Sequence, residues 1–191
     1  MSLRRLLTAL LVFAIAGAAA PALAQRITAI DPARSEIRFV STQMNVPVEG
    51  RFRKFNAKLD FDPAKPAASK AEIEVDLNSV DTGSDEADTE VKTKGWFNLA
   101  VFPSAKFVSG TVKPAGAGRF EVTGKLTIKG KSMDVTAPVT VKQEGQNIVF
   151  EGGFTLLRLQ FGIGEGVWSD TETVANEVQV RFRLVGLGRK P

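Results

Sequence analysis

Histidine, cysteine and tyrosine are all absent from the 191 residues of this chain, and with them most of the side chains that carry enzyme chemistry. Without histidine or cysteine there is no Ser-His-Asp triad, no Cys-His pair, no histidine-ligated haem and no zinc site built from those ligands. No disulfide can form. The chemistry that remains belongs to carboxylates, lysines, arginines, amides and apolar surfaces.

Carboxylates gather in one acidic segment, at Asp81, Asp85, Glu86, Asp88 and Glu90. Paired carboxylates can hydrolyse a glycosidic bond, but no pair here is distinguished from the others. A calcium loop needs its oxygens and its glycine at set positions, and residues 81–85 do not provide them. We therefore interpret the segment as the acidic start of a helix with a solvent-exposed face.

The glycine-rich segment Gly162-Ile163-Gly164-Glu165-Gly166 resembles a nucleotide-binding loop in its spacing. Such a loop joins a strand to a helix within a βαβ unit, and a β-patterned segment follows this one instead. A flexible loop or a strand bulge is the better interpretation.

Arg158 lies among apolar neighbours between Phe154 and Phe161. A buried arginine needs a partner for its charge. Two interpretations stay open at this point: a structural ion pair or outward-facing arginine, or a guanidinium that holds the polar head group of a ligand.

Apolar and polar residues alternate with a period of two along most of the chain, which predicts strand after strand. The clearest rows are 36–41, 71–77, 133–141 and 178–184. In the row that ends at Phe61, Phe52 is one residue out of step with Phe55, so we expect a β-bulge near Arg53-Lys54. Turn signals separate the rows at 62–63, 114–118, 129–130 and 144–145.

One segment is different, because Ser84 can cap a helix that runs to Lys94 and stops at Gly95. The predicted fold is therefore all-β: an extended, eight-stranded antiparallel barrel with one short helix inserted between strands. A β-sandwich with a similar number of strands is the alternative.

Residues 1–24 have the order of a secretory signal: Arg4 and Arg5, an apolar run over 6–20, and the small-residue site Ala22-Leu23-Ala24. An uncleaved N-terminal anchor is the alternative. We expect cleavage before Gln25, a periplasmic location and a single domain over 25–191. Loss of the two arginines brings the net charge near balance, which argues little for a nucleic-acid partner.

The 13 phenylalanines lie mostly on the apolar faces of the predicted strands. Such a stripe usually forms an ordinary packed core. An eight-stranded barrel, however, is the size at which side chains either fill the interior or leave room for one small apolar ligand. Both interpretations stay open on the pattern alone.

Five motifs, in chain order, resemble the signatures of the YceI-like family. They are Gly50-Arg-Phe52-Arg-Lys-Phe55; Ser79-Val80-Asp81-Thr82-Gly83; Asp88 to Val91 with Trp96-Phe97, Phe102-Pro103 and Phe107-x-Ser109; Gly124-Lys-Leu126-Thr127-Ile128-Lys-Gly130; and Arg158-Leu-Gln-Phe161-Gly162-Ile163. The resemblance implies an extended lipocalin-like barrel, usually periplasmic, whose interior holds a polyisoprenoid chain. It implies a binding protein rather than an enzyme.

Three positions depart from the family pattern toward uncharged amides. Gln43 replaces a frequent histidine, Gln160 replaces the aspartate of the last motif, and Asn176 stands at an acidic position near the last strand. These changes put in doubt the polar or metal chemistry that those positions support elsewhere, but they leave the apolar lining intact.

The primary hypothesis is a periplasmic binding or carrier protein that holds an isoprenoid lipid, a quinone or a polyprenyl chain, in an apolar barrel cavity. The expected lining residues are Phe39, Phe52, Phe55, Phe107, Phe120, Leu126, Phe150, Phe154, Phe161 and Phe182. The head-group candidates are Gln43, Arg158 and Gln160.

The alternative is an enzyme or accessory factor that acts on an isoprenoid or acyl substrate, and a fully packed interaction module is a third hypothesis. We expect no catalytic residue, no metal, no cofactor apart from the lipid ligand, and no nucleic-acid partner. Transient membrane contact for loading and a homodimer are left open.

Overall fold

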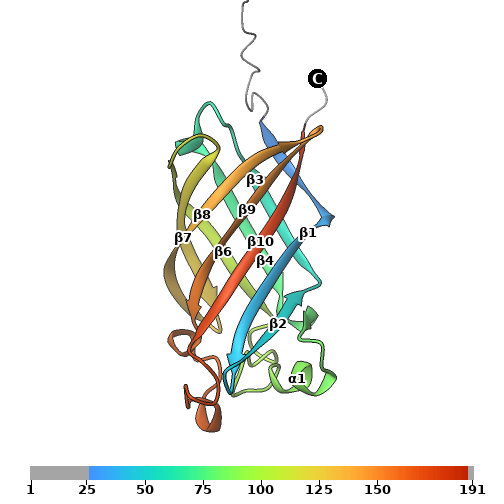
Figure 1. The fold of residues 1–191 in the computed structure, drawn as a ribbon, viewed down its shortest axis with the longest axis vertical. Helices are drawn as coiled ribbons and strands as arrows, with labels where there is room; N and C mark the ends of the chain where they lie inside the picture. Colours follow the sequence, from blue (N-terminus) through green and yellow to red (C-terminus); the bar gives the residue numbers. More distant parts are fainter. Residues whose placement is uncertain (1–25, 189–191) are drawn as a thin grey trace, which may run out of the picture.

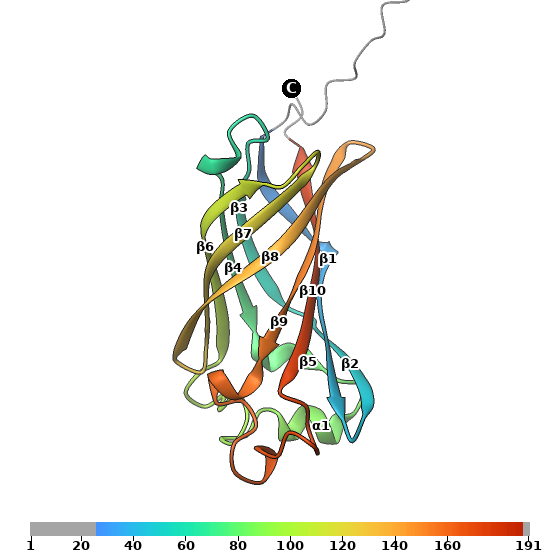
Figure 2. The same cartoon turned by 60° about the vertical axis from the view of Figure 1, so that its left-hand side comes forward.

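Ten strands form one antiparallel sheet that curls into an elongated barrel in the computed structural model, which describes residues 26–188 (Figures 1 and 2). The sheet order is β3-β4-β6-β7-β8-β9-β10-β1-β2-β5. The strands are β1 Ile27–Gln43, β2 Val46–Phe52, β3 Phe55–Asp60, β4 Lys70–Asp76, β5 Val80–Asp81, β6 Ser104–Pro114, β7 Arg119–Ile128, β8 Lys131–Glu144, β9 Asn147–Leu157 and β10 Glu177–Gly188. The all-β, antiparallel, barrel-like prediction is confirmed. The predicted signal segment lies outside the described residues.

The chain beyond β3, one end strand of the sheet, is joined to the start of β1. Ile27 and Phe61 exchange two backbone hydrogen bonds of 2.9 Å each, so the start of β1 meets the chain just after β3. The far end of β1 pairs with β2 instead. The strand β1 therefore contacts the chain after β3 at its start and pairs with β2 at its end, and these contacts close the wall of the barrel.

The prediction of eight strands is wrong, because an expected bulge is a break between two strands and because one very short strand was not foreseen. The bulge expected near Arg53-Lys54 is a break that separates β2 from β3. The Arg53 amide donates to the Ser79 carbonyl at 3.0 Å and the Lys54 amide donates to Ser79 Oγ at 2.9 Å, which takes both amides away from the sheet. The second addition, β5, has only two residues and thus no period to detect.

The inserted helix is confirmed, but it is shorter than expected. Helix α1 spans Asp85–Glu90, with Ser84 as its N-cap. Its C-terminal half was predicted to reach Lys94; instead the Phe97 amide donates to the Val91 carbonyl at 3.0 Å, and the chain turns back at once. The short 3-10 helices are η1 Pro66–Ala68, η2 Leu77–Ser79, η3 Arg158–Phe161 and η4 Gly166–Trp168. Between residues 26 and 188 no helix is long and apolar enough to cross a membrane.

The strand order gives the barrel two distinct ends. The α1 end, defined by the connections 44–45, 77–103, 129–130 and 158–176, lies at the bottom of Figure 1. The opposite end carries the connections 61–69, 115–118 and 145–146, together with the start of β1 and the end of β10. Two hydrophobic clusters support these ends, one around Phe61, Phe120 and Phe150 and the other around Leu77 and Phe161.

Candidate functional site

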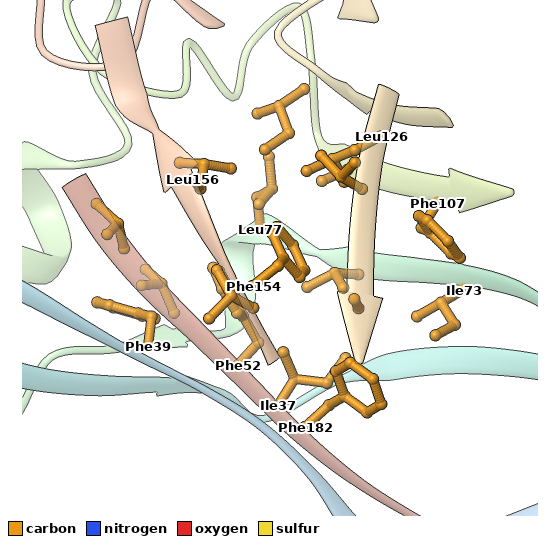
Figure 3. A pocket seen from close by; sticks show the side chains of 18 of the residues that line it. Ile37, Phe39, Phe52, Ile73, Leu77, Phe107, Leu126, Phe154, Leu156 and Phe182 are labelled. Atoms are coloured by element: carbon orange, nitrogen blue, oxygen red, sulfur yellow. The ribbon is translucent and has the colours of Figure 1, made fainter. Parts of the chain in front are cut away.

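The interior of the barrel is hollow. A cavity of about 890 Å³ extends along it, lined by residues of both hydrophobic clusters. This volume falls in the upper part of the roughly 300–1,000 Å³ range of ligand pockets. Figure 3 shows part of this lining, and the side chains labelled there are aliphatic and aromatic and come from several strands. A fully packed barrel is therefore excluded.

Most of the expected lining residues border this cavity. They are Phe39, Phe52, Phe107, Phe120, Leu126, Phe150, Phe154 and Phe182. The prediction is wrong for Phe55 and Phe161. Phe55, the first residue after the break between β2 and β3, packs against the cluster around Phe61. Phe161 is buried in the cluster around Leu77. Both rings pack against neighbouring side chains and do not line the cavity.

Glycines opposite phenylalanines help to keep the cavity open. Phe39 pairs with Gly50 across β1 and β2, and Phe182 pairs with Gly152 across β10 and β9. A Cβ atom on Gly50 would lie only 2.3 Å from the tip of the Phe39 ring, and one on Gly152 would lie 2.6 Å from the tip of the Phe182 ring. Because no side chain stands in the way, each ring lies flat against the opposite strand instead of projecting into the interior.

Gly50→Ala is the cleanest test of this arrangement, because the three atoms nearest to the new methyl group all belong to the Phe39 ring. We expect the ring to rotate into the cavity and the affinity for a lipid to fall about tenfold, while the loss of stability stays below the roughly 1–3 kcal/mol of an overpacked core. Gly110→Ala is the matched control, since its nearest contact is an ordinary 3.5 Å. Lipid titration and thermal unfolding of both variants check this; equal affinities would contradict it.

Arg158 is buried and fully engaged, with 1% of its surface exposed. All five of its N–H donors bind backbone carbonyls at 2.6–3.0 Å, from Ile163, Gly164, Trp168, Val174 and Ala175. Its guanidinium also lies 5.8 Å from the centre of the Trp96 ring. Burial lowers the pKa of Arg158, but an arginine stays charged in proteins.

This geometry corrects the head-group assignment of Arg158, because no donor is left for a ligand. It also differs from the expected ion pair, because the charge is balanced by carbonyl dipoles. One glycine of the glycine-rich segment is explained by the same contact: Gly164 has φ 75°, and a Cβ atom there would lie 2.3 Å from Arg158 Nη1. Gly164 therefore makes room for the arginine, and the loop interpretation of the segment is confirmed.

Glu90, Trp96 and Trp168 form a hydrogen-bonded cluster next to Arg158 that the sequence analysis did not predict. Glu90 Oε1 accepts hydrogen bonds from the indole N–H groups of Trp96 at 3.2 Å and Trp168 at 2.8 Å. The two indole rings are 5.7 Å apart. All three side chains line the cavity, so this cluster ties α1 to η4 across its end. The tight turn at 91–97 brings Trp96 back to Glu90, and no local pattern in the sequence announces it.

Two further carboxylates of the acidic segment, Asp81 and Asp88, hold neighbouring parts of the chain. Asp81 forms ion pairs with Arg51 at 2.8 Å and Arg53 at 2.9 Å, and the hydrogen bond from Arg51, followed by that from Arg53, lowers the pKa of Asp81. Asp88 Oδ1 accepts from the Thr82 amide at 2.8 Å and from its hydroxyl at 2.7 Å. In the described part of the chain, no group of three or more acidic side chains could hold a metal ion.

A family profile described as the YceI-like domain matches residues 29–186. The chain belongs to the YceI-like family. Among solved structures, BcnA of Burkholderia cenocepacia has 47% sequence identity and a TM-score of 0.80, covering 82% of this chain and 99% of that one. A structure described as a polyisoprenoid binding domain from Saccharophagus degradans, implicated in plant cell wall breakdown, has a TM-score of 0.66. It covers 87% of this chain and 99% of that one, but at 19% identity it shows the fold alone.

Relatives described as UPF0312 proteins match shorter stretches. That of Azotobacter vinelandii is 32% identical over 148 residues, covering 72% of this chain and 73% of that one. That of Shewanella denitrificans is 41% identical over 104 residues, so this chain spans about half the length of that relative, 52%.

The three amides that depart from the YceI-like pattern lie in different places. Gln43, at the end of β1, borders the cavity. Gln160 is exposed on η3 and does not reach it, so its proposed contact with a head group is wrong. Asn176 Oδ1 accepts from the Leu159 amide at 3.1 Å and holds the chain beside Arg158. Only Gln43 is placed to touch a ligand.

Proposed function

We propose that this chain binds an isoprenoid lipid in the barrel cavity and acts as a periplasmic carrier. The observation that supports this most directly is the hollow, apolar interior of an otherwise well-packed barrel. Its membership of the YceI-like family supports the same ligand class. Catalysis is not part of the proposal, because three carboxylates of the acidic segment, Asp81, Asp88 and Glu90, are engaged with arginine, threonine and tryptophan partners.

The energetics suit a carrier. Moving each CH₂ group of the lipid out of water is worth about 0.8 kcal/mol. The competing site is a bilayer, where the chain is already dry, so transfer from membrane to protein is nearly neutral overall. Selectivity must then come from the shape of the cavity and from its polar end. A protein with these properties both takes up and releases its ligand.

The polar end of the cavity lies beside α1, where Gln43, Thr82, Ser84, Glu86 and Glu90 join the lining. The guanidinium at this end, Arg158, has no donor left. Carboxylates without an available cation repel a phosphate and accept hydrogen bonds from a hydroxyl group. Within the proposal, the head group is therefore uncharged, as in a quinone, quinol or prenyl alcohol.

Fluorescence titration of delipidated protein with ubiquinone tests this function. Trp96 and Trp168, the two tryptophans of the chain, both line the cavity, so a ligand at that end changes their emission. We expect saturable quenching with one lipid per chain, and at least about tenfold weaker binding of undecaprenyl phosphate. Absence of any saturable response to isoprenoid lipids, checked by direct separation of bound from free lipid, would falsify the proposal.

The periplasmic part of the proposal is supported by the sequence of residues 1–24, with its paired arginines, apolar run and Ala22-Leu23-Ala24 site. Recovery of the protein from the periplasmic fraction with Gln25 as its first residue is the expected result. A membrane-retained protein that begins at Met1 would contradict it.

A further inference from the structure

We propose that the α1 end of the barrel docks on the surface of a lipid bilayer, with Met44, Val46, Val101 and Val167 entering the interface. This inference rests on the proposed function, because it identifies the end through which the lipid is exchanged. To the proposed function, the docking proposal adds the residues that contact the membrane and their partner, an uncharged bilayer surface.

Four aliphatic side chains project from the α1 end into solvent. The exposed fraction is 71% for Met44, 60% for Val46, 62% for Val101 and 85% for Val167. They stand on three separate connections: the β1–β2 hairpin, the 98–103 turn and η4. Single exposed hydrophobics are common on soluble proteins, but several on neighbouring loops mark a contact surface.

Hydrogen bonds hold these three connections together. The Met44 amide donates to the Thr173 carbonyl at 2.8 Å, which joins the hairpin to the 158–176 connection. The amides of Gly164 and Glu165 donate to the Gly95 carbonyl at 2.9 and 2.7 Å, which joins that connection to the 91–103 turns. Figures 1 and 2 show all three at the same end of the barrel. The apolar tips therefore form part of one preorganised face.

Met44 occupies its position at a conformational cost. Its φ is 49° and that of Asn45 is 63°, the left-handed pair of a two-residue hairpin turn. Asparagine and glycine suit such turns, whereas a bulky residue is uncommon there. A methionine at this tip is not favoured by the turn geometry and does not pack in the core. Insertion of its side chain into an apolar phase accounts for its presence.

The opposite end lacks this character. Its connections at 62–68, 115–118 and 145–146 consist of alanine, glycine, proline and polar residues. The other large exposed hydrophobics of the described chain are Leu187, 40% exposed near the end of β10, and Val108, 43% exposed on β6. The cavity shows a similar bias, because most of its exposed polar lining residues lie at the α1 end. These are Gln43, Ser84, Glu86 and Thr89, whereas Lys106 lies on β6 and Lys70 at the opposite end. A lipid leaving at the α1 end would enter the bilayer without crossing water.

The charges of this end favour an uncharged surface over an anionic one. Lys129, at the β7–β8 turn, is paired with Glu165 at 2.8 Å. Lys92, Lys94 and Lys131 are offset by the acidic residues of α1 and by Asp170 and Glu172. With positive and negative charge interspersed, attraction to anionic lipid is weak, and docking depends on the apolar tips.

The test measures transfer of ubiquinone from loaded protein to phosphatidylcholine vesicles, followed by the recovery of tryptophan emission. The test variant is Met44→Asn with Val167→Ser, which removes two apolar tips and places a suitable residue in the turn. The matched control is Val108→Ser with Leu187→Ser, away from the α1 end. We expect the initial rate to fall about tenfold in the test variant. The control should keep the wild-type rate.

Further readouts separate the outcomes. The wild-type rate should rise in proportion to vesicle concentration and stay constant when salt is added. Equal rates in wild type and test variant, a rate independent of vesicle concentration, or a rate abolished by salt would overturn the docking proposal. If the wild-type protein binds no lipid, the proposed function fails on its own. Flotation of the wild type and the test variant with the same vesicles then decides docking: loss of flotation in the variant supports it, and equal flotation overturns it.

Discussion

Replacement of Val75 by tryptophan is expected to abolish lipid binding while leaving thermal unfolding nearly unchanged. Val75 lines the cavity on β4, and its neighbour across the sheet on β6 is the small residue Ala105. An indole at this position extends into empty space. In a packed core the same enlargement costs about 1–3 kcal/mol, which for a domain of this size lowers the unfolding midpoint by roughly 2–4 °C per kcal/mol.

Glu74→Trp is the matched control for this variant. Glu74 precedes Val75 on the same strand and is exposed on the outer face of the barrel. We expect Glu74→Trp to bind ubiquinone like the wild type. Retained binding in Val75→Trp, or a fall in midpoint of about 5 °C or more, would show that the interior is not the open binding space proposed here.

Substitution of Arg158 is expected to cause the largest loss of stability. Arg158→Leu removes the donor from five carbonyls, three of them in fully buried hydrogen bonds. Each buried group left unsatisfied costs about 1–3 kcal/mol before water enters. We expect a net loss of about 3–5 kcal/mol, a large share of the roughly 5–15 kcal/mol that stabilises a typical domain. Chemical denaturation followed by tryptophan emission measures it.

Two further variants make the Arg158 result interpretable. Arg158→Lys keeps the charge but supplies fewer donors, so its loss should be intermediate. Arg181→Leu removes an exposed arginine from the outer face of β10 and should change stability by less than about 0.5 kcal/mol. Amide exchange in Arg158→Lys should rise first across 158–176, the connection that the guanidinium holds. A stability equal to wild type in Arg158→Leu would refute the assigned role.

Strand positions were predictable where one face of the sheet is buried. The rows 71–77, 133–141 and 178–184 correspond to β4, β8 and β10, because alternation with a period of two follows directly from burial of one face. The break at Arg53-Lys54 was detected as an irregularity but not as a strand boundary. Its cause is a contact with Ser79, about 25 residues away, which local pattern does not contain.

Occupancy of the interior was not predictable from pattern, because inward phenylalanines suit both a packed core and a cavity. The difference lies in details such as the close approach of the Phe39 ring to Gly50. The partners of Arg158 were equally hidden, since backbone carbonyls have no signature in the sequence. The YceI-like motifs supplied the expectation of a ligand that the periodicity left open.

The most direct test of the central claim is mass spectrometry of the protein isolated from its native host under conditions that preserve bound lipid, followed by organic extraction. We predict a complex of one chain with one isoprenoid lipid that has an uncharged head group, held in the cavity of about 890 Å³. The Val75→Trp variant, isolated in parallel, should carry none. A native protein that is free of lipid and that takes up none from isoprenoid-containing vesicles would contradict the account.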